Sequence, residues 1–225
     1  MKNTSDRLKA VLKKIREYEK SFEHTDDSVS LLAVSKKQSI TSIKQAYKAG
    51  QRAFGENYLQ EALPKIQNLT APNISWHFIG NIQSNKTRDV AENFDWVHTI
   101  DREKIAFRLN DHRAKSAKVL NVLIQVNISG EETKSGIKLE ALPELIAIVD
   151  SLPWLKLRGV MGMPAQHPDF EQQCQSFEPL IKAVKSNDYN FDTISIGTSG
   201  DFKAAIAVGS TMVRIGEAIF GPRKG

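Results

Sequence analysis

The chain has 225 residues, of which 40% are hydrophobic and 25% are charged, and its formal net charge at pH 7 is +5. No apolar run approaches the roughly 20 residues that cross a bilayer, which excludes a membrane-spanning chain. Basic residues are scattered among acids without an aromatic-interleaved RNA motif, and Cys174 is the only cysteine, which argues against nucleic-acid binding, disulfides and thiolate metal clusters.

The organisation of the chain is simple. No composition break or linker divides it, so we predict one domain over residues 1–225. The N-terminal segment lacks a signal-peptide core, which makes the cytoplasm the default location. The five histidines show no H-E-x-x-H or comparable spacing, so we predict no metal site.

The first predicted elements are a helix and a strand. Apolar residues between positions 4 and 22 recur at three- and four-residue steps, which predicts an amphipathic helix. The run at 29–35 is short and rich in Val and Leu, which predicts a buried strand. Side chains alternate across a strand, so Leu32, Val34 and Lys36 share one face, and only one of Lys36 and Lys37 can point inward.

Helices and strands then alternate with short connections. Further strands are predicted at 52–54, 74–79, 95–99, 119–128, 155–161, 193–196 and 212–215. Further helices are predicted at 39–50, 55–67, 86–93, 101–117 with Asp101 as its cap, 139–151, 170–185 and 201–208, and residues 129–136 read as a flexible loop.

This alternation predicts the fold. It indicates an α/β protein with a parallel sheet covered by helices, and eight strands predict a closed (β/α)8 TIM barrel. The ten residues after the last strand are too few for a normal closing helix, so we expect the N-terminal helix to take that place. The alternative is an open doubly wound sheet, but the first turn at 35–38 lacks a glycine-rich phosphate fingerprint.

Lys36, at the end of the first strand, has two interpretations. It could be a surface lysine that caps the strand and extends its ammonium group to water. It could instead be a desolvated amine of lowered pKa that forms a Schiff base with a carbonyl compound. Lys36 alone does not decide between them.

Two glycine-rich turns stand where barrels commonly bind phosphate, after strands seven and eight. The first, Gly197–Asp201, opens a helix whose free amide groups favour an anion. The second follows Arg214, and its Gly216 allows the backbone to approach a ligand closely. Together with Lys36 at the same rim, these turns indicate one ligand that carries a phosphate and an aldehyde, which describes pyridoxal 5′-phosphate (PLP).

Six runs of the sequence resemble the pyridoxal phosphate homeostasis proteins (the YggS/PROSC family) in order and over nearly the whole chain. They are residues 33–36 (AVSK), 54–57 (FGEN), 76–86 (WHFIGNIQSNK), 159–163 (GVMGM), 197–201 (GTSGD) and 213–216 (VRIG). The departure is Thr198, where this family more often has methionine.

The resemblance implies an alanine-racemase-type barrel, PLP fold type III, that binds the cofactor as an internal aldimine on Lys36. It implies phosphate contacts from Ser199, Gly200 and the backbone at Gly216 and Glu217, with Arg214 facing the pyridine nitrogen. Such an arginine disfavours the protonated pyridine, so the bound ring would be a weak electron sink.

Other residues expected at the rim have both a functional and a purely structural interpretation. Asn57, His77, Asn81 and Met161 could contact the cofactor or merely end strands. Lys134 and Ser135 resemble a family segment implicated in secondary cofactor handling, although a solvated loop lysine is the alternative.

The function predicted from the sequence is a cytoplasmic PLP carrier that maintains vitamin B6 and amino-acid and keto-acid balance. It would have no catalytic residue and would pass PLP to apoenzymes as a monomer. The enzymatic alternative is a racemase of low activity, which needs a second acid/base opposite Lys36, and Tyr58 is the one tyrosine expected near the rim.

Overall fold

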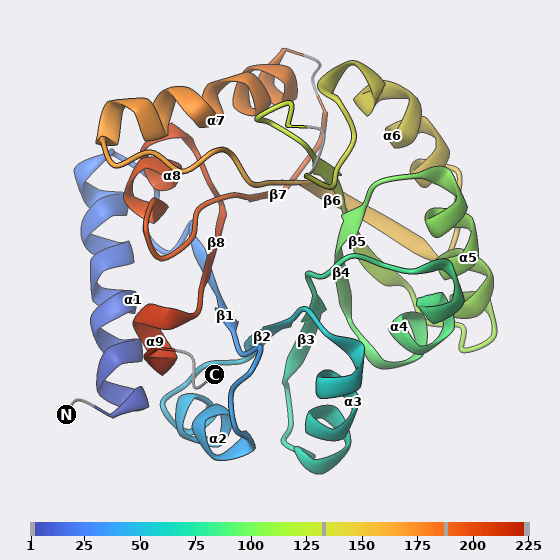
Figure 1. Ribbon diagram of the computed structural model, residues 1–225, viewed down its shortest axis with the longest axis horizontal. Helices are drawn as coiled ribbons and strands as arrows, with labels where there is room; N and C mark the ends of the chain where they lie inside the picture. Colours follow the sequence, from blue (N-terminus) through green and yellow to red (C-terminus); the bar gives the residue numbers. More distant parts are fainter. Residues whose placement is uncertain (1–2, 132–133, 187–188, 223–225) are drawn as a thin grey trace.

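The computed structural model describes residues 3–131, 134–186 and 189–222. Eight parallel strands form one closed barrel in which each strand pairs with the next along the chain and β8 pairs with β1. The helices surround this barrel (Figure 1). The predicted (β/α)8 barrel is therefore confirmed over the open-sheet alternative.

The strands are β1 (Ser30–Val34), β2 (Ala53–Glu56), β3 (Ser75–Phe78), β4 (Trp96–Ile100), β5 (Leu120–Val126), β6 (Leu155–Gly162), β7 (Thr193–Ser195) and β8 (Met212–Ile215). The α-helices are α1 (Thr4–Ser21), α2 (Ile40–Lys48), α3 (Leu59–Asn68), α4 (Thr87–Asn93), α5 (Glu103–Ala114), α6 (Leu142–Asp150), α7 (Phe170–Lys185), α8 (Phe202–Val208) and α9 (Glu217–Phe220). Single 3-10 turns, η1 (Ser84–Lys86) and η2 (Leu139–Ala141), precede α4 and α6.

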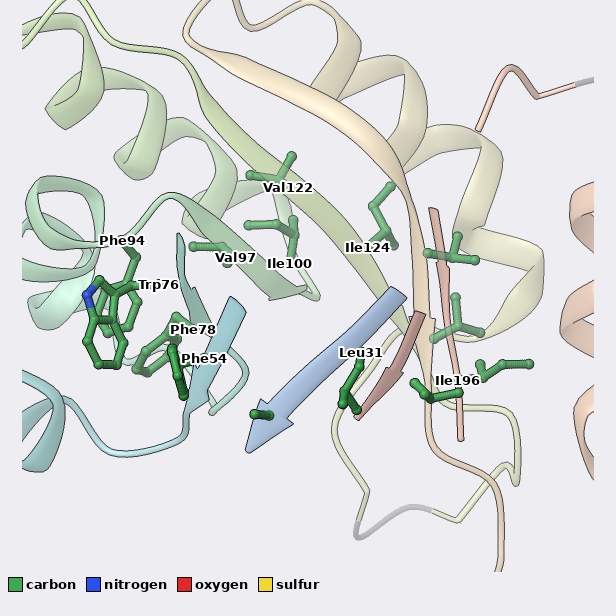
Figure 2. Packing of buried hydrophobic residues seen from close by; sticks show 14 of the residues in the cluster. Leu31, Phe54, Trp76, Phe78, Phe94, Val97, Ile100, Val122, Ile124 and Ile196 are labelled. Atoms are coloured by element: carbon green, nitrogen blue, oxygen red, sulfur yellow. The ribbon is translucent and has the colours of Figure 1, made fainter. Parts of the chain in front are cut away.

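The main apolar core lies between the outer faces of the strands and the helices. Figure 2 shows Phe54, Trp76, Phe78 and Phe94 gathered in one part of this layer. The side chains of β1 alternate as predicted. Leu31 belongs to this outer layer, whereas Leu32 points into the barrel, where it lies against Gly55. The inner face of each strand therefore leads to the open end of the barrel, where the ligands of such folds bind.

The N-terminal helix α1 takes the place of a closing helix, as predicted. It contacts α2, α8 and α9 and lies beside β8 and β1 (Figure 1). Asn3 caps it, since the Asn3 Oδ1 accepts a hydrogen bond from the Asp6 amide at 2.9 Å. After β8 the chain forms the four-residue helix α9, which packs against α1.

Two local predictions are corrected. Gly55 and Glu56 were expected to open a helix but belong to β2, because their backbone pairs with His77 and Phe78 of β3. Asp101 was expected to cap α5, but the cap position is Arg102, which has no side-chain cap bond. The Asp101 carboxylate instead pairs with the Arg102 guanidinium at 2.6 Å.

Within the described ranges, none of the helices combines the length and apolar character that crossing a membrane requires.

Candidate functional site

Two adjoining cavities open where the strands end, with volumes of about 370 Å³ and 670 Å³. Six residues line both: Asn57, Ile79, Met163, Gln166, Thr198 and Arg214. Because they share these walls, a ligand in the smaller cavity would form part of the boundary of the larger one.

The smaller cavity collects most of the residues that the sequence singles out. Of the ten residues predicted to contact the cofactor, eight line it: Lys36, Asn57, Met161, Ser199, Gly200, Arg214, Gly216 and Glu217. They come from the ends of β1, β2, β6, β7 and β8, so the parallel barrel brings them together from distant parts of the sequence. Gln38 and Gln166, which the sequence analysis did not single out, line the same cavity.

Lys36 lies on a tight turn just past β1, with the Gln38 amide donating to the Ser35 carbonyl at 3.0 Å. Lys37, the next residue, has a positive φ of 58°, which turns the chain away from the strand direction. Lys36 lines the cavity whereas Lys37 is exposed, so the lysine predicted to share the inner face with Val34 is the one that does.

A buried ion pair holds this turn from below. The Lys65 ammonium group donates to the Ser35 carbonyl at 2.9 Å and to the Glu56 Oε1 at 2.8 Å. The Ser35 hydroxyl donates to the same Glu56 oxygen at 2.6 Å. On the other side of Lys36, the Lys37 amide donates to the Glu61 Oε2 at 2.9 Å. The backbone on both sides of Lys36 is therefore fixed by charged side chains.

Glu56 is fully buried, and this burial raises the pKa of its carboxyl group from the ordinary value of 4.5. The charge of Lys65 and the hydrogen bonds from Lys65 and Ser35 act in the opposite direction. The carboxylate is thus tolerated in the barrel wall because Lys65 compensates it.

The turn after β7 has the character of an anion site. The Thr198 amide and hydroxyl both donate to the Asp201 Oδ1, at 2.6 and 2.9 Å, which closes the turn. Ser199 and Gly200 are exposed, and in the part of the chain that the structure describes their amides donate to no protein acceptor. These two amides are available to a ligand.

Arg214 rises from β8 into the wall between the two cavities and is 5% exposed. Its guanidinium donates to the Ser195 hydroxyl at 2.9 Å and to the Gly162 carbonyl at 3.0 Å. Burial lowers the pKa of Arg214 to about 10, against the opposing effect of Asp201, so the group remains charged at neutral pH. Its position is fixed by two neighbouring strands.

His77 is not brought to either cavity, which corrects its prediction as a rim contact. It lies inside the barrel, two residues below Ile79, and its Nδ1 is 2.9 Å from the Nε2 of His98. Ser75 and the Trp96 ring complete its surroundings. Burial lowers the pKa of His77 to about 3, so the imidazole is neutral and serves the interior packing of the barrel.

The larger cavity includes the loop predicted to be flexible, of which residues 132 and 133 lie outside the described residues. The Lys134 ammonium donates to the Glu131 Oε1 at 2.6 Å and to the Ser129 hydroxyl at 3.3 Å. It lines the cavity with 33% of its side chain exposed. Ser135, Asn81 and the exposed Tyr58 line the same cavity.

Two buried amide oxygens in the cavity walls have no hydrogen-bond partner among the described residues: Asn57 Oδ1 and Gln125 Oε1. A buried acceptor without a partner is costly, so each indicates a missing donor. The sequence did contain a signal for Gln125, because it is a polar residue near the end of the otherwise largely apolar strand β5.

A close backbone contact positions Asn57. A Cβ added to Gly80 would lie 2.0 Å from the Asn57 carbonyl oxygen. Replacing Gly80 by alanine should therefore push the ends of β2 and β3 apart and lower the free energy of unfolding by about 1–3 kcal/mol. Denaturant unfolding would measure the change, with Gly200→Ala as the control because no atom outside its chain neighbours lies within 4 Å of the position of its added Cβ. Equal stabilities of the two variants would contradict the prediction.

The chain is similar to known proteins over nearly its whole length. The chain matches the family described as "Alanine racemase, N-terminal domain" over residues 7–224. It is 50% identical over 230 aligned residues to a protein of Vibrio alginolyticus named "Pyridoxal phosphate homeostasis protein", covering 99% of both chains.

Solved structures show the same fold. PipY of Synechococcus elongatus PCC7942, solved with PLP bound, is 29% identical with a TM-score of 0.81, covering 97% of this chain and all of that one. Alanine racemase of Clostridium difficile 630 has a TM-score of 0.74 at 16% identity, and the match covers 98% of this chain and 58% of the enzyme. This second likeness concerns the fold alone.

Proposed function

This chain belongs to the alanine racemase N-terminal domain family and, within it, to the pyridoxal phosphate homeostasis proteins, and on that premise we propose that it holds PLP in the smaller cavity. The observation that carries the proposal is the meeting of Lys36 with both glycine-rich turns around one space of about 370 Å³. A relative of the same fold was solved with PLP bound, which supports the assignment.

Lys36 is proposed as the residue that holds the cofactor covalently. Bound PLP supplies an aldehyde carbon for attachment and an electron-accepting ring. The deprotonated Lys36 amine attacks that carbon, water leaves, and the C=N bond that forms can be reversed by hydrolysis. A reversible link suits a protein that stores and releases a reactive aldehyde.

The two turns are proposed as the phosphate site. Ser199 and Gly200 offer amides at the start of α8, and Gly216 and Glu217 offer backbone at the start of α9. Gly216 is suited to this place, because a Cβ there would lie 3.0 Å from the Val34 carbonyl oxygen and crowd the floor of the cavity. The residues present therefore fit a phosphate group.

Asn57 and Met161 complete the fit. The Asn57 Oδ1 lacks a partner in the described structure, so a hydrogen-bond donor on the ligand would satisfy it. Met161 is buried at the end of β6 and presents an apolar surface to the same cavity. A ligand with an apolar ring and polar substituents matches these walls.

Arg214 is proposed to face the pyridine nitrogen and to keep the ring a weak electron sink. Its guanidinium is held by Ser195 and Gly162 and stays charged, so it cannot accept a proton from the ring. Of the chain's four tyrosines, all within the described residues, only Tyr58 lines either cavity, and it is 51% exposed. These features favour a carrier without catalytic residues over a racemase.

The proposed role is the upkeep of PLP supply. The protein would keep the aldehyde bound in the cytoplasm, act as a monomer, and pass PLP to PLP-dependent apoenzymes, which links it to amino-acid and keto-acid balance. Lys134 and Ser135, in the wall of the larger cavity, are proposed to contact the cofactor as it leaves.

The proposal is tested by the absorption spectrum of the purified protein with PLP. A visible band from the protonated Schiff base is expected, and borohydride reduction followed by peptide mapping should find the adduct on Lys36. Adducts spread over surface lysines, or no band, would refute the assignment of the site.

A further inference from the structure

Arg7 of α1 donates hydrogen bonds to α9, the short helix that follows β8, although 212 positions separate it from Ile219. Its Nε donates to the Ile219 carbonyl at 2.8 Å, and its Nη2 donates to the Phe220 carbonyl at 3.1 Å. Both carbonyls lie at the end of α9, where a helix has unsatisfied acceptors and a negative dipole end. The guanidinium is therefore a cap for α9 supplied by a distant helix.

This cap lies directly behind the wall of the smaller cavity. Gly221, the residue after α9, lines the cavity, and a Cβ added there would lie 3.5 Å from the Arg7 Nη1. Arg7 itself lines neither cavity. It can act on a bound ligand only through the backbone of α9.

The last turn of α1 and the segment just after it are attached to α8. The His24 Nε2 lies 2.7 Å from the Ile206 carbonyl oxygen of α8, and the Tyr18 ring packs on the Phe202 ring with 5.5 Å between centroids. Thus α1 contacts both helices that follow the two glycine-rich turns. It connects them on the side away from the cavity.

The length of α9 explains why such a cap matters. A helix of four residues does not hold its conformation alone, because the cost of forming the first turn exceeds what so few hydrogen bonds return. Backbone amides that hold a phosphate must keep donor-to-acceptor distances near 2.9 Å and well-aligned angles. A small rotation of α9 would therefore misalign the amides of Gly216 and Glu217 with the phosphate oxygens.

We propose that Arg7 is a positioning residue for the phosphate group of the ligand, acting by fixing α9 against α1. The inference rests on the proposed function, since it concerns the same cavity. It separates the two ends of the ligand, because Arg7 supports the phosphate turn whereas Lys36 lies on a different turn, held by Glu56 and Lys65.

The test compares two aldehydes that differ by the phosphate. Equilibrium titrations followed by the visible band would give dissociation constants for PLP and for pyridoxal, which lacks the phosphate. In Arg7→Gln we expect PLP to bind about tenfold more weakly, the effect of losing hydrogen bonds from a charged group, while pyridoxal changes less than about twofold. Arg7→Lys keeps the charge but places its donors on one nitrogen, and we expect an intermediate loss confined to PLP.

Arg16→Gln is the matched control. Arg16 is also on α1 and also donates to a backbone carbonyl, that of Val29 just before β1 at 3.1 Å, but its hydrogen bonds and ion pairs in the described structure go to neither α8 nor α9. It should lower thermal stability without changing the ratio of the two dissociation constants.

Three results would overturn the inference. Equal weakening of PLP and pyridoxal in Arg7→Gln would make Arg7 a general structural residue, and unchanged binding of both would remove any role. If Arg7→Gln does not fold, the same comparison of the PLP and pyridoxal dissociation constants is made in Arg7→Lys. Failure of the wild-type protein to bind PLP saturably would instead refute the proposed function, and the inference with it.

Discussion

Replacing Lys36 by alanine is expected to abolish the visible absorption band that PLP produces with the wild-type protein. Without the amine no C=N bond to the aldehyde can form, and the remaining contacts are non-covalent. The fold should survive, because Lys36 lies on a turn at the cavity rim and belongs to no apolar core layer. Absorbance titration measures the first effect, and circular dichroism with thermal unfolding measures the second.

Lys37→Ala is the matched control for this experiment. Lys37 is the adjacent lysine, is exposed, and lines neither cavity, so its removal should leave the band intact. Lys36→Arg would keep the positive charge but remove the reactive amine, and it should behave as the alanine variant does. A band that persists in Lys36→Ala would show that another amine holds the aldehyde, and an unfolded Lys36→Ala protein would show that this lysine is structural.

The fold was predictable where one local pattern decides the element. The period-2 pattern of β1 placed Val34 and Lys36 on the inner face, and α7 and β8 have the bounds predicted from the sequence. One error arose where pairing with another strand overrides local preference. Gly55 reads as a helix start in isolation, but its backbone is used by β3.

The site was predictable to the extent that the barrel rule applies. Once eight strands are recognised, the ends of β1, β7 and β8 must meet, which brings Lys36 to the two glycine turns. Depth inside the barrel is harder to predict, and His77 shows this, because a shift of two residues along β3 separates the rim from the interior. No sequence pattern could single out Arg7, since its partners are backbone carbonyls at the other end of the chain.

The second large effect is expected at the ion pair beneath the Lys36 turn. Replacing Lys65 by methionine would leave the fully buried Glu56 carboxylate without a counter-charge. Breaking a buried pair from one side costs about 3–5 kcal/mol of unfolding free energy at neutral pH. Urea unfolding of Lys65→Met against the wild-type protein measures this loss, and a change below about 1 kcal/mol would contradict the prediction.

The unfolding free energy lost in Lys65→Met should depend on pH, and the titration of Glu56 sets the direction of that dependence. Its pKa is already raised by burial in the native protein, so the native state binds more protons than the unfolded state above pH 4.5, and stability falls as the pH rises through that window. Removing Lys65 deletes the charge and the hydrogen bond that hold this pKa down. The window then extends upward, and Lys65→Met should lose less stability at pH 5 than at pH 8.

The double variant Glu56→Gln with Lys65→Met separates charge from packing. With neither charge present the penalty of an unpaired ion disappears, so the double variant should be more stable than Lys65→Met at pH 8 and should lack its pH dependence. Because the Ser35 carbonyl loses its Lys65 donor in both variants, the turn that carries Lys36 is loosened in both. PLP and pyridoxal should then weaken together, in contrast to Arg7→Gln, because this turn holds the aldehyde end that the two ligands share.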